Sequence, residues 1–406
     1  MTLSEILPSL GASLRPRLDP ANWPLTARWT EPGDLTVGGV PVTRIAAAHG
    51  TPVHVIDETD VHSRCAEYVA AFGPGAVCCS AKGGLLRGAA RWIARDGLGC
   101  YCRSAAELRT ALDAGIRPES LALFGSGKSV ADLEAALSCG AAVVIGSASE
   151  AEVVAARSRP GQRVLLRVRP GSAQRGYGVR LNSSAALAAV ATVTRSRRLV
   201  LAGLDCSLGH RLNRFGTYES CLREAIGFVA RLRTTVPVLN LGGGHAADLP
   251  VGIFAARLRA VAQVTSEGYG IEPPEVHVSP GRALLGRAGI TVHRVVAAGD
   301  GVIELDGDVP DCLPGADCAG LHTAALIGRA SPAPGRSITV RCGDATVAVA
   351  ELPGDMAAGD LVALSGTGAY HQRRDVYVGR PAVVAVCGGR ARTLLPRETI
   401  DRILYA

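Results

Sequence analysis

The stretch AVVIGSASEAEVVAARSRPGQRVLLRV (142–168) contains the pattern that decides the fold. Two apolar, β-branched runs, AVVIG (142–146) and RVLLRV (163–168), enclose a longer segment of helical period. Short apolar runs that alternate with helical segments are typical of strand–helix units around a parallel sheet. We therefore predict a strand, a helix and a second, parallel strand here.

The same alternation extends from residue 52 to residue 282 and predicts a closed barrel. After an introductory run, PVHVI (52–56), the predicted strands are residues 76–80, 98–102, 121–124, 142–146, 163–168, 199–206, 236–242 and 275–279. The predicted helices include 104–115, 129–139 and 216–233. Eight strands separated by helices fit a (β/α)8 TIM barrel better than an open sheet, so we expect an α/β barrel over residues 46–285.

After about residue 285 the sequence changes to short strands separated by Gly, Pro and Asp turns, such as SITVRCG (337–343) and DLVALSG (360–366). This pattern predicts a β-domain. The run DLTVGGVPV (34–42) is also strand-like, and we predict that it can pair with this domain. The predicted second domain, a β-sandwich or β-barrel, comprises residues 1–45 and 286–406.

The composition, 48% hydrophobic and 19% charged over 406 residues, is that of a globular protein with a large core. We find no apolar run of 18 residues and no signal peptide, so we expect a soluble cytoplasmic protein without a membrane partner. The net charge of +7 is dispersed among acidic residues, which argues against a nucleic-acid partner. The 12 cysteines are scattered through apolar runs, and we expect reduced thiols and no metal site.

Lysine is rare in this chain: of 43 Lys and Arg residues, only Lys82 and Lys128 are lysines. A lysine amine can lose its proton and attack a carbonyl, whereas a guanidinium stays charged. Lys82 follows the predicted strand 76–80, at the end of the barrel where catalytic groups gather. Its position suggests a Schiff base. Lys128 lies in a loop before a helix, and its role stays open between structure and function.

Two further segments follow strands at the same end of the barrel. Gly242, Gly243 and Gly244 can bring backbone N–H groups to an anion, and Arg282 after Gly281 adds a guanidinium. Each alone fits a tight turn or a solvated charge equally well. Together with Lys82 they describe a site for pyridoxal phosphate, the aldehyde cofactor that bonds to lysine.

The order of motifs resembles that of the fold-type III PLP-dependent decarboxylases, the diaminopimelate and ornithine decarboxylase family. The motifs are GGVPVTRIAAAHGTPVHVID (38–57), SAKG (80–83), LALFGSGKS (121–129), LLRVRPG (165–171), LNLGGG (239–244), SPGRAL (279–284), and GTGAYH (366–371) followed by YVGRP (377–381). The resemblance implies an alanine-racemase-like PLP barrel with a C-terminal β-domain that includes an N-terminal strand. It also implies a head-to-tail homodimer with shared active sites.

Carried over residue by residue, the resemblance makes Lys82 the Schiff-base lysine. It places these residues at the cofactor: Ser207, Gly242, Gly243, Gly244, Ser279, Gly281, Arg282 and, from the partner subunit, Tyr370. Cys342 and His210 are the further catalytic candidates, and Asp344 and Arg282 are candidates for substrate binding. Glu107 matches the glutamate of the family's SxxEL element. The alternative is that Glu107 is only a carboxylate on the face of a helix.

Three motifs depart from the family pattern. Ser279 stands where the family usually has a glutamate paired with the pyridine nitrogen, unless another acid such as Asp205 approaches. The family's HIGS reads SLGH (207–210), so the histidine has moved by three residues. The partner-subunit loop CESxD reads RCGD (341–344), in which Cys342 remains a candidate proton donor. The missing acid argues against free ornithine, lysine or meso-diaminopimelate as substrate.

The leading hypothesis is PLP-dependent decarboxylation at the α-carboxylate of an amino acid or amino-acid derivative through Lys82, as in secondary metabolism. A racemase or epimerase that keeps the cofactor is the closest alternative. A non-catalytic PLP-binding homologue and a barrel enzyme that uses Lys82 without PLP also remain open.

Overall fold

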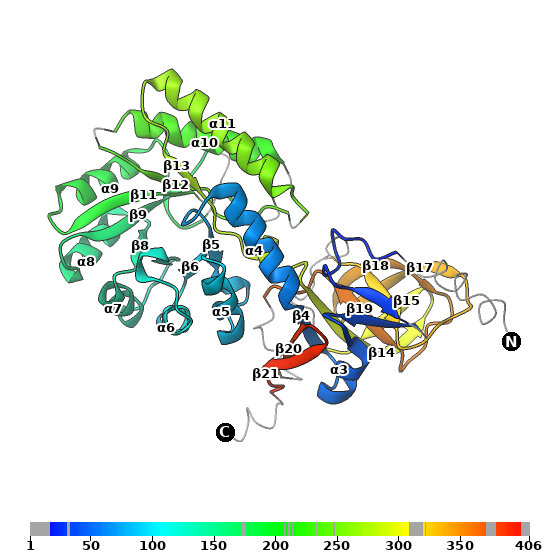
Figure 1. Ribbon diagram of the computed structural model, residues 1–406. Helices are drawn as coiled ribbons and strands as arrows, with labels where there is room; N and C mark the ends of the chain where they lie inside the picture. Colours follow the sequence, from blue (N-terminus) through cyan, green and yellow to red (C-terminus); the bar gives the residue numbers. More distant parts are fainter. Residues whose placement is uncertain are drawn as a thin grey trace. The chain divides into compact units, whose positions relative to one another are not determined.

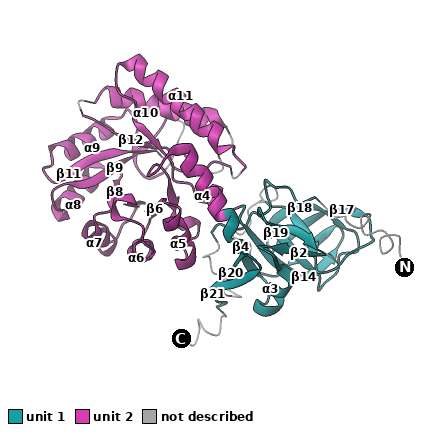
Figure 2. Ribbon diagram, viewed as in Figure 1, with its two compact units in different colours: residues 1–60, 287–406 teal, residues 61–286 magenta. Residues whose placement is uncertain are grey.

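The computed structural model describes residues 17–30, 33–171, 176–206, 208–209, 212, 214–232, 234–246, 248–307, 320, 322–370 and 379–398. The chain divides into two compact units (Figure 2). Unit 1 combines residues 1–60 with residues 287–406, and unit 2 is residues 61–286. Residues 46–60, which the sequence analysis placed with the barrel, therefore lie in unit 1.

Unit 2 contains the predicted parallel barrel. Its eight strands are β5 (Cys78–Ser80), β6 (Gly99–Cys102), β7 (Leu121–Leu123), β8 (Ala142–Ile145), β9 (Gln162–Arg169), β11 (Leu199–Cys206), β12 (Val238–Asn240) and β13 (Glu275–His277), and each pairs with its neighbour in chain order. A short strand, β10 (Val179–Arg180), adds to β9. The ring closes between Val77 and Val278, where the Cys78 amide donates to the Val278 carbonyl at 3.0 Å. The predicted TIM barrel is thus confirmed.

Helices flank these strands, as Figure 1 shows for α5 to α11. They are α4 (Glu58–Phe72), α5 (Arg87–Arg95), α6 (Ala105–Asp113), α7 (Val130–Cys139), α8 (Ala148–Arg157), α9 (Ser184–Arg195), α10 (Phe215–Ala230) and α11 (Val251–Tyr269). Serine side chains cap four of them, at Ser104, Ser129, Ser147 and Ser183. Each hydroxyl accepts the N–H of the residue three places on, which satisfies one of the free donors of a helix start. These caps end four of the strand-to-helix loops at a fixed residue.

The barrel interior is filled by side chains rather than open. One buried layer consists of Tyr101, Ala122, Ala142, Val144 and Leu165. Strands that are buried on both faces read as continuous apolar runs, which explains why the periodicity of the sequence located them. Catalytic groups are therefore confined to the loops at the carboxyl ends of the strands.

Unit 1 is built around a mixed sheet in the order β18-β17-β15-β14-β4-β20-β21. These strands are β4 (Val53–Asp57), β14 (Gly289–Gly299), β15 (Val302–Leu305), β17 (Gly335–Cys342), β18 (Ala345–Pro353), β20 (Ala382–Cys387) and β21 (Arg390–Leu395), with β19 (Leu361–Ser365) joining β14 to β16 (Ala324–Ile327). Strand β4 lies between β14 and β20. The introductory run of the sequence analysis is thus the N-terminal strand of the β-domain.

The strand-like run at residues 34–42 has a different place. It forms β2 (Asp34–Val37) and β3 (Val40–Pro41), which pair with β1 (Arg28–Thr30) in a separate three-stranded sheet, and α3 (Val42–His49) follows. Leu35, Val37 and Val40 are buried in one core with side chains of β4, β14 and β20. This run therefore joins the β-domain through side-chain packing rather than through strand pairing.

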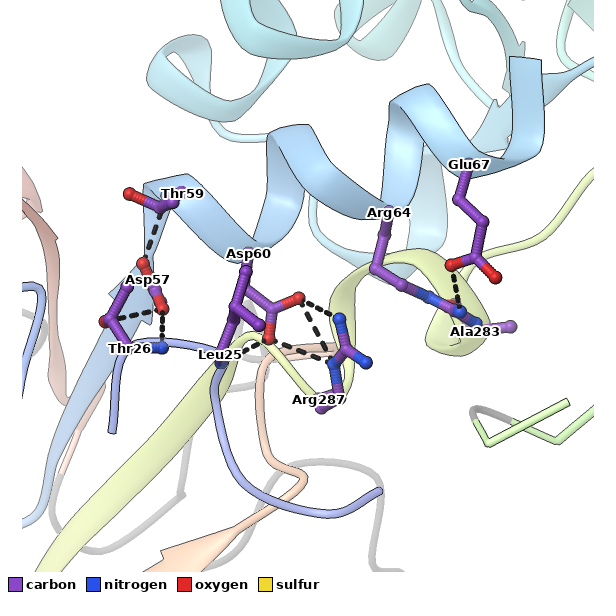
Figure 3. Close-up of polar contacts among 9 residues, drawn as sticks. All are labelled: Leu25, Thr26, Asp57, Thr59, Asp60, Arg64, Glu67, Ala283 and Arg287. Atoms are coloured by element: carbon purple, nitrogen blue, oxygen red, sulfur yellow. Dashed lines mark hydrogen bonds and ion pairs between the residues drawn. The ribbon is translucent and has the colours of Figure 1, made fainter. Parts of the chain in front are cut away.

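Buried charges organise the start of α4 (Figure 3). Asp60 is fully buried and accepts hydrogen bonds from the Leu25 amide and from the guanidinium of Arg287, whose Nε lies 3.1 Å from Oδ2. One turn later, Arg64 donates to the carbonyl of Ala283 at 3.1 and 3.2 Å and pairs with Glu67 at 2.6 Å. Ala283 follows Arg282, so Arg64 holds the backbone beside a predicted phosphate ligand.

The cysteines that the structure describes are all unbonded thiols, as the sequence analysis predicted. Burial raises the pKa of the Cys78 and Cys79 thiols to about 12. These side chains act as small apolar groups of the barrel wall. Within the described ranges, no helix has the length and apolar character needed to cross a membrane.

Candidate active site

Lys82 lies at the carboxyl end of β5, in a single turn of 3-10 helix, Ala81–Gly83. Its neighbours Ala81 and Gly83 are buried, whereas Lys82 itself is exposed. The strand therefore fixes the backbone while the amine reaches the surface of the catalytic face. This is the geometry that a lysine needs to meet a small aldehyde.

Backbone hydrogen bonds join the Lys82 turn to the two other predicted segments. The Ser80 amide donates to the Pro280 carbonyl at 3.0 Å, and the Ser279 amide donates to the Gly242 carbonyl at 2.9 Å. A Cβ added to Gly83 would lie 3.1 Å from the Cα of Gly281. The structure thus brings together the lysine, the glycine run and the segment of Arg282.

The glycine run is required by the backbone itself. Gly242 and Gly244 have φ angles of +74° and +91°, which favour glycine. A Cβ on Gly243 would lie 2.6 Å from the Ser279 carbonyl oxygen, closer than real Cβ contacts. The run is therefore a tight turn, and it also leaves a cradle of backbone space that a side chain would fill. The structure is thus compatible with both interpretations of the run, a turn and an anion-binding site.

The donors at this cradle fit a phosphate. Arg282 is half-buried and starts the short helix α12 (Arg282–Leu285) directly after Gly281. A guanidinium beside bare glycine backbone is suited to a dianion. Lys82 supplies the amine, so the described residues fit pyridoxal phosphate.

A buried polar network lies next to the cradle. The sequence analysis named two of its members, Asp205 and Ser279. Asp205, at the end of β11, is fully buried and pairs with Arg167. The side-chain amide of Asn240 donates to Asp205 Oδ1 at 2.6 Å and lies 3.4 Å from Ser279 Oγ. Asn240 Oδ1 in turn accepts the Gly242 amide at 3.1 Å. This network links Ser279 to Asp205 through Asn240.

Lys128 is the enclosed lysine of the chain, with 2% of its side chain exposed. Its Nζ donates to Glu150 Oε1 at 2.6 Å, to the Gly125 carbonyl at 2.7 Å and to the Tyr177 hydroxyl at 2.9 Å. Burial lowers the pKa of Lys128, while Glu150 opposes that shift. All three amine protons have acceptors, so Lys128 is built as a structural ion pair.

Sequence reasoning missed a histidine under the glycine run. His245 is 3% exposed, and its Nε2 lies 2.5 Å from the Tyr68 hydroxyl. Tyr218 donates to the Gly243 carbonyl at 3.5 Å, and the Phe254 ring packs against His245. Burial lowers the pKa of His245 to about 4, so the ring is neutral. The only sequence signal was the position of His245 directly after Gly244.

Glu107 is accounted for by helix α6. Its Oε2 accepts the Arg103 amide at 2.6 Å, and its own amide donates to Ser104 Oγ at 3.3 Å. Burial raises the pKa of Glu107. The SxxE element is therefore a helix N-cap, which corresponds to the structural interpretation left open above.

The other predicted site residues lie in unit 1 or outside the described residues. Cys342 ends β17 and is 4% exposed within an apolar cluster, and the exposed Gly343-Asp344 pair forms the two-residue turn to β18. Tyr370 is half-buried with a φ angle of +65°, an uncommon conformation that is found at functional sites. Ser207 and His210 lie outside the described residues, so their roles stay predictions.

Fold and site together define a TIM-barrel enzyme with an exposed lysine beside an anion cradle. The family model described as the pyridoxal-binding domain of pyridoxal-dependent decarboxylases matches residues 58–286. The chain belongs to this family, which confirms the cofactor and the enzyme class, a PLP-dependent carboxy-lyase.

Individual relatives extend the match over the whole chain. The chain is 35% identical over 434 residues to a diaminopimelate decarboxylase of Actinosynnema pretiosum subsp. auranticum, with 100% of this chain and 99% of the relative covered. It is 34% identical over 436 residues to that of Mycobacterium tuberculosis, with 95% and 98% covered. The structure of diaminopimelate decarboxylase from M. jannaschii in complex with L-lysine matches with a TM-score of 0.80 at 18% identity, covering 94% of this chain and 97% of that chain.

Proposed function

We propose that Lys82 bonds to pyridoxal phosphate and that the site removes the α-carboxylate of an amino acid. The observation that carries this proposal is the pair of backbone hydrogen bonds that join Ser80 to Pro280 and Ser279 to Gly242. They hold an exposed amine, a glycine cradle and Arg282 on one rim. Relatives of 34–35% identity named diaminopimelate decarboxylase support the reaction class.

Pyridoxal phosphate supplies an aldehyde for the lysine amine and a ring that takes up the electron pair left when CO2 departs. The chain's own residues bind and orient it. Gly242, Gly243 and Gly244 offer backbone N–H groups to the phosphate, and Arg282 neutralises its charge. By the family resemblance, Ser279 would lie at the ring nitrogen of the bound cofactor. The buried His245 and Tyr68 support the glycine turn from behind and keep water out.

Cys342, Asp344 and Tyr370 complete the site from a second copy of the chain in a homodimer. Cys342 returns a proton to the α-carbon, Tyr370 contacts the cofactor and Asp344 binds the substrate. The order of family motifs supports this arrangement. Mixing a Lys82→Ala protein with a Cys342→Ala protein tests it, because heterodimers regain one intact site. No recovery of activity would contradict shared sites. We also infer a cytoplasmic location, because the described cysteines are all unbonded thiols.

The first substrate candidate is meso-diaminopimelate, which the names of the full-length relatives support. The hairpin turn favours a second candidate, an amino acid without a distal ammonium group. Gly343 and Asp344 form the whole turn between β17 and β18, and this turn carries one carboxylate where the family pattern has two acidic positions. Arg341 beside it pairs with Glu304 at 3.1 Å.

The reaction is tested with the holo-protein and amino acids labelled in the α-carboxylate, in deuterated water. We expect release of labelled CO2 and one deuterium in the amine product. Exchange of the α-hydrogen without CO2 would instead indicate a racemase. Absence of both, with the cofactor bound, would contradict the proposed reaction.

A further inference from the structure

Ser279 and its partners carry an inference about the ring nitrogen of the cofactor, and it rests on the proposed function. The side-chain oxygen of Asn240 accepts the Gly242 amide, so its NH2 group faces Asp205 and Ser279. The amide group donates to Asp205 at 2.6 Å and to Ser279 at 3.4 Å, and it also reaches the Tyr101 hydroxyl. Ser279 Oγ is thereby an acceptor toward Asn240, and its own proton is left for another group.

No described residue accepts that Ser279 proton. Ser279 is half-buried at the rim, between the glycine run and Arg282. A serine hydroxyl whose acceptor side faces Asn240 presents a donor to the cofactor. A neutral pyridine nitrogen accepts such a hydrogen bond, whereas a protonated one needs a nearby acid to keep its charge.

The acid suggested from the sequence does not fill that role. Asp205 has 0% exposure, and its two oxygens are taken by Arg167 and by Asn240. Its charge is neutralised inside the barrel and acts on Asn240 rather than at the surface of the cradle. Among the described residues, no carboxylate hydrogen-bonds to Ser279.

We propose that Ser279 donates a hydrogen bond to an unprotonated ring nitrogen of pyridoxal phosphate, and that Asn240, Asp205 and Arg167 are positioning residues that orient this hydroxyl. The ring is then a weaker electron sink than one paired with a carboxylate. Substrates whose own groups stabilise the developing carbanion are favoured at such a site.

The direct test uses holo-protein reconstituted with pyridoxal phosphate labelled with ¹⁵N in the ring. We expect the nitrogen chemical shift of an unprotonated pyridine in the wild-type protein and in Ser279→Ala, and that of a pyridinium in Ser279→Glu. A pyridinium shift in the wild-type protein, with CO2 release intact, would overturn the inference and leave the proposed function standing. No bound ¹⁵N signal at all would overturn both.

A second measurement does not depend on the folding of Ser279→Glu. We expect the wild-type protein to bind pyridoxal phosphate about 3- to 10-fold more tightly than its analogue with C–H in place of the ring nitrogen. In Ser279→Ala this ratio should fall to about 1. Ser266→Ala, which removes a buried hydroxyl from α11, is the matched control and should keep the wild-type ratio. An unchanged ratio in Ser279→Ala would contradict the inference.

Discussion

The amide of Ser80 donates a hydrogen bond to the carbonyl of Pro280 at 3.0 Å, which fixes the Lys82 turn beside the segment that carries Arg282. The distance between the amine and the anion cradle is therefore set by backbone rather than by flexible side chains. A site of this kind tolerates little change in the glycines that allow the turns to meet.

Gly243→Ala should weaken cofactor binding and destabilise the barrel. The new Cβ would lie 2.6 Å from the Ser279 carbonyl, so the backbone must shift, at a cost of about 1–3 kcal/mol. Denaturant unfolding and cofactor titration measure the two effects. Gly252→Ala in α11, where a Cβ meets nothing within 4 Å, is the control and should be neutral or slightly stabilising. Equal stability and equal cofactor affinity of the two variants would contradict the assignment of Gly243 to the anion cradle.

Lys128→Met should lower the free energy of unfolding by about 1–3 kcal/mol, because Glu150 loses its buried cation but keeps the Gly146 amide and the Tyr177 hydroxyl as donors. Lys82→Met should leave the stability of the apo-protein nearly unchanged, because Lys82 is exposed. Its loss should instead abolish the absorption band of the bound cofactor. Chemical denaturation and visible spectroscopy of both variants check that Lys128 stabilises the fold and that Lys82 binds the cofactor. A cofactor band that survives in Lys82→Met would refute the role of Lys82.

The stability of the protein should fall as the pH drops from 6.5 toward 4. Burial lowers the pKa of His245 to about 4, so in this window the unfolded chain binds a proton that the folded chain does not. The contribution is at most about 3 kcal/mol. In Tyr68→Phe/His245→Phe, which removes both hydrogen-bonding partners, this part of the slope should vanish. Tyr68→Phe alone should keep it. Urea unfolding as a function of pH decides between these outcomes.

Cys342→Ala should lower kcat by about 10²- to 10⁴-fold if the thiol returns the proton to the α-carbon. Cys221→Ala removes another buried thiol, in α10, and should leave kcat unchanged. Steady-state kinetics with the substrate that the labelled-CO2 assay identifies measures both. If the two variants behave alike, Cys342 is a core side chain of the β17–β18 hairpin.

The barrel could be predicted from the sequence because its strands are buried on both faces. Residues such as Val143, Ile145, Val164 and Leu166 give apolar runs whose limits match β8 and β9 closely. The place of β4 could not be predicted in this way. Its run at residues 53–57 is also fully buried, and only its pairing with β14 and β20, far along the chain, assigns it to the β-domain.

The site shows the same contrast. Lys82 and the glycine run carry local signals, namely a rare residue type and a need for positive φ. The partners of Lys128 and Asp205 come from distant elements, Glu150 with Tyr177 and Arg167 with Asn240, and no local pattern indicates those pairs. Which lysine is enclosed and which is exposed follows from tertiary packing alone.

The central claim is tested most directly by reducing the holo-protein with borohydride and mapping the labelled residue by peptide mass spectrometry. The chain provides its own control, because Lys82 and Lys128 are its only lysines. We predict that the reduced cofactor is attached to Lys82 and that Lys128 is unmodified. A label on Lys128, or on the N-terminal amine alone, would contradict the account.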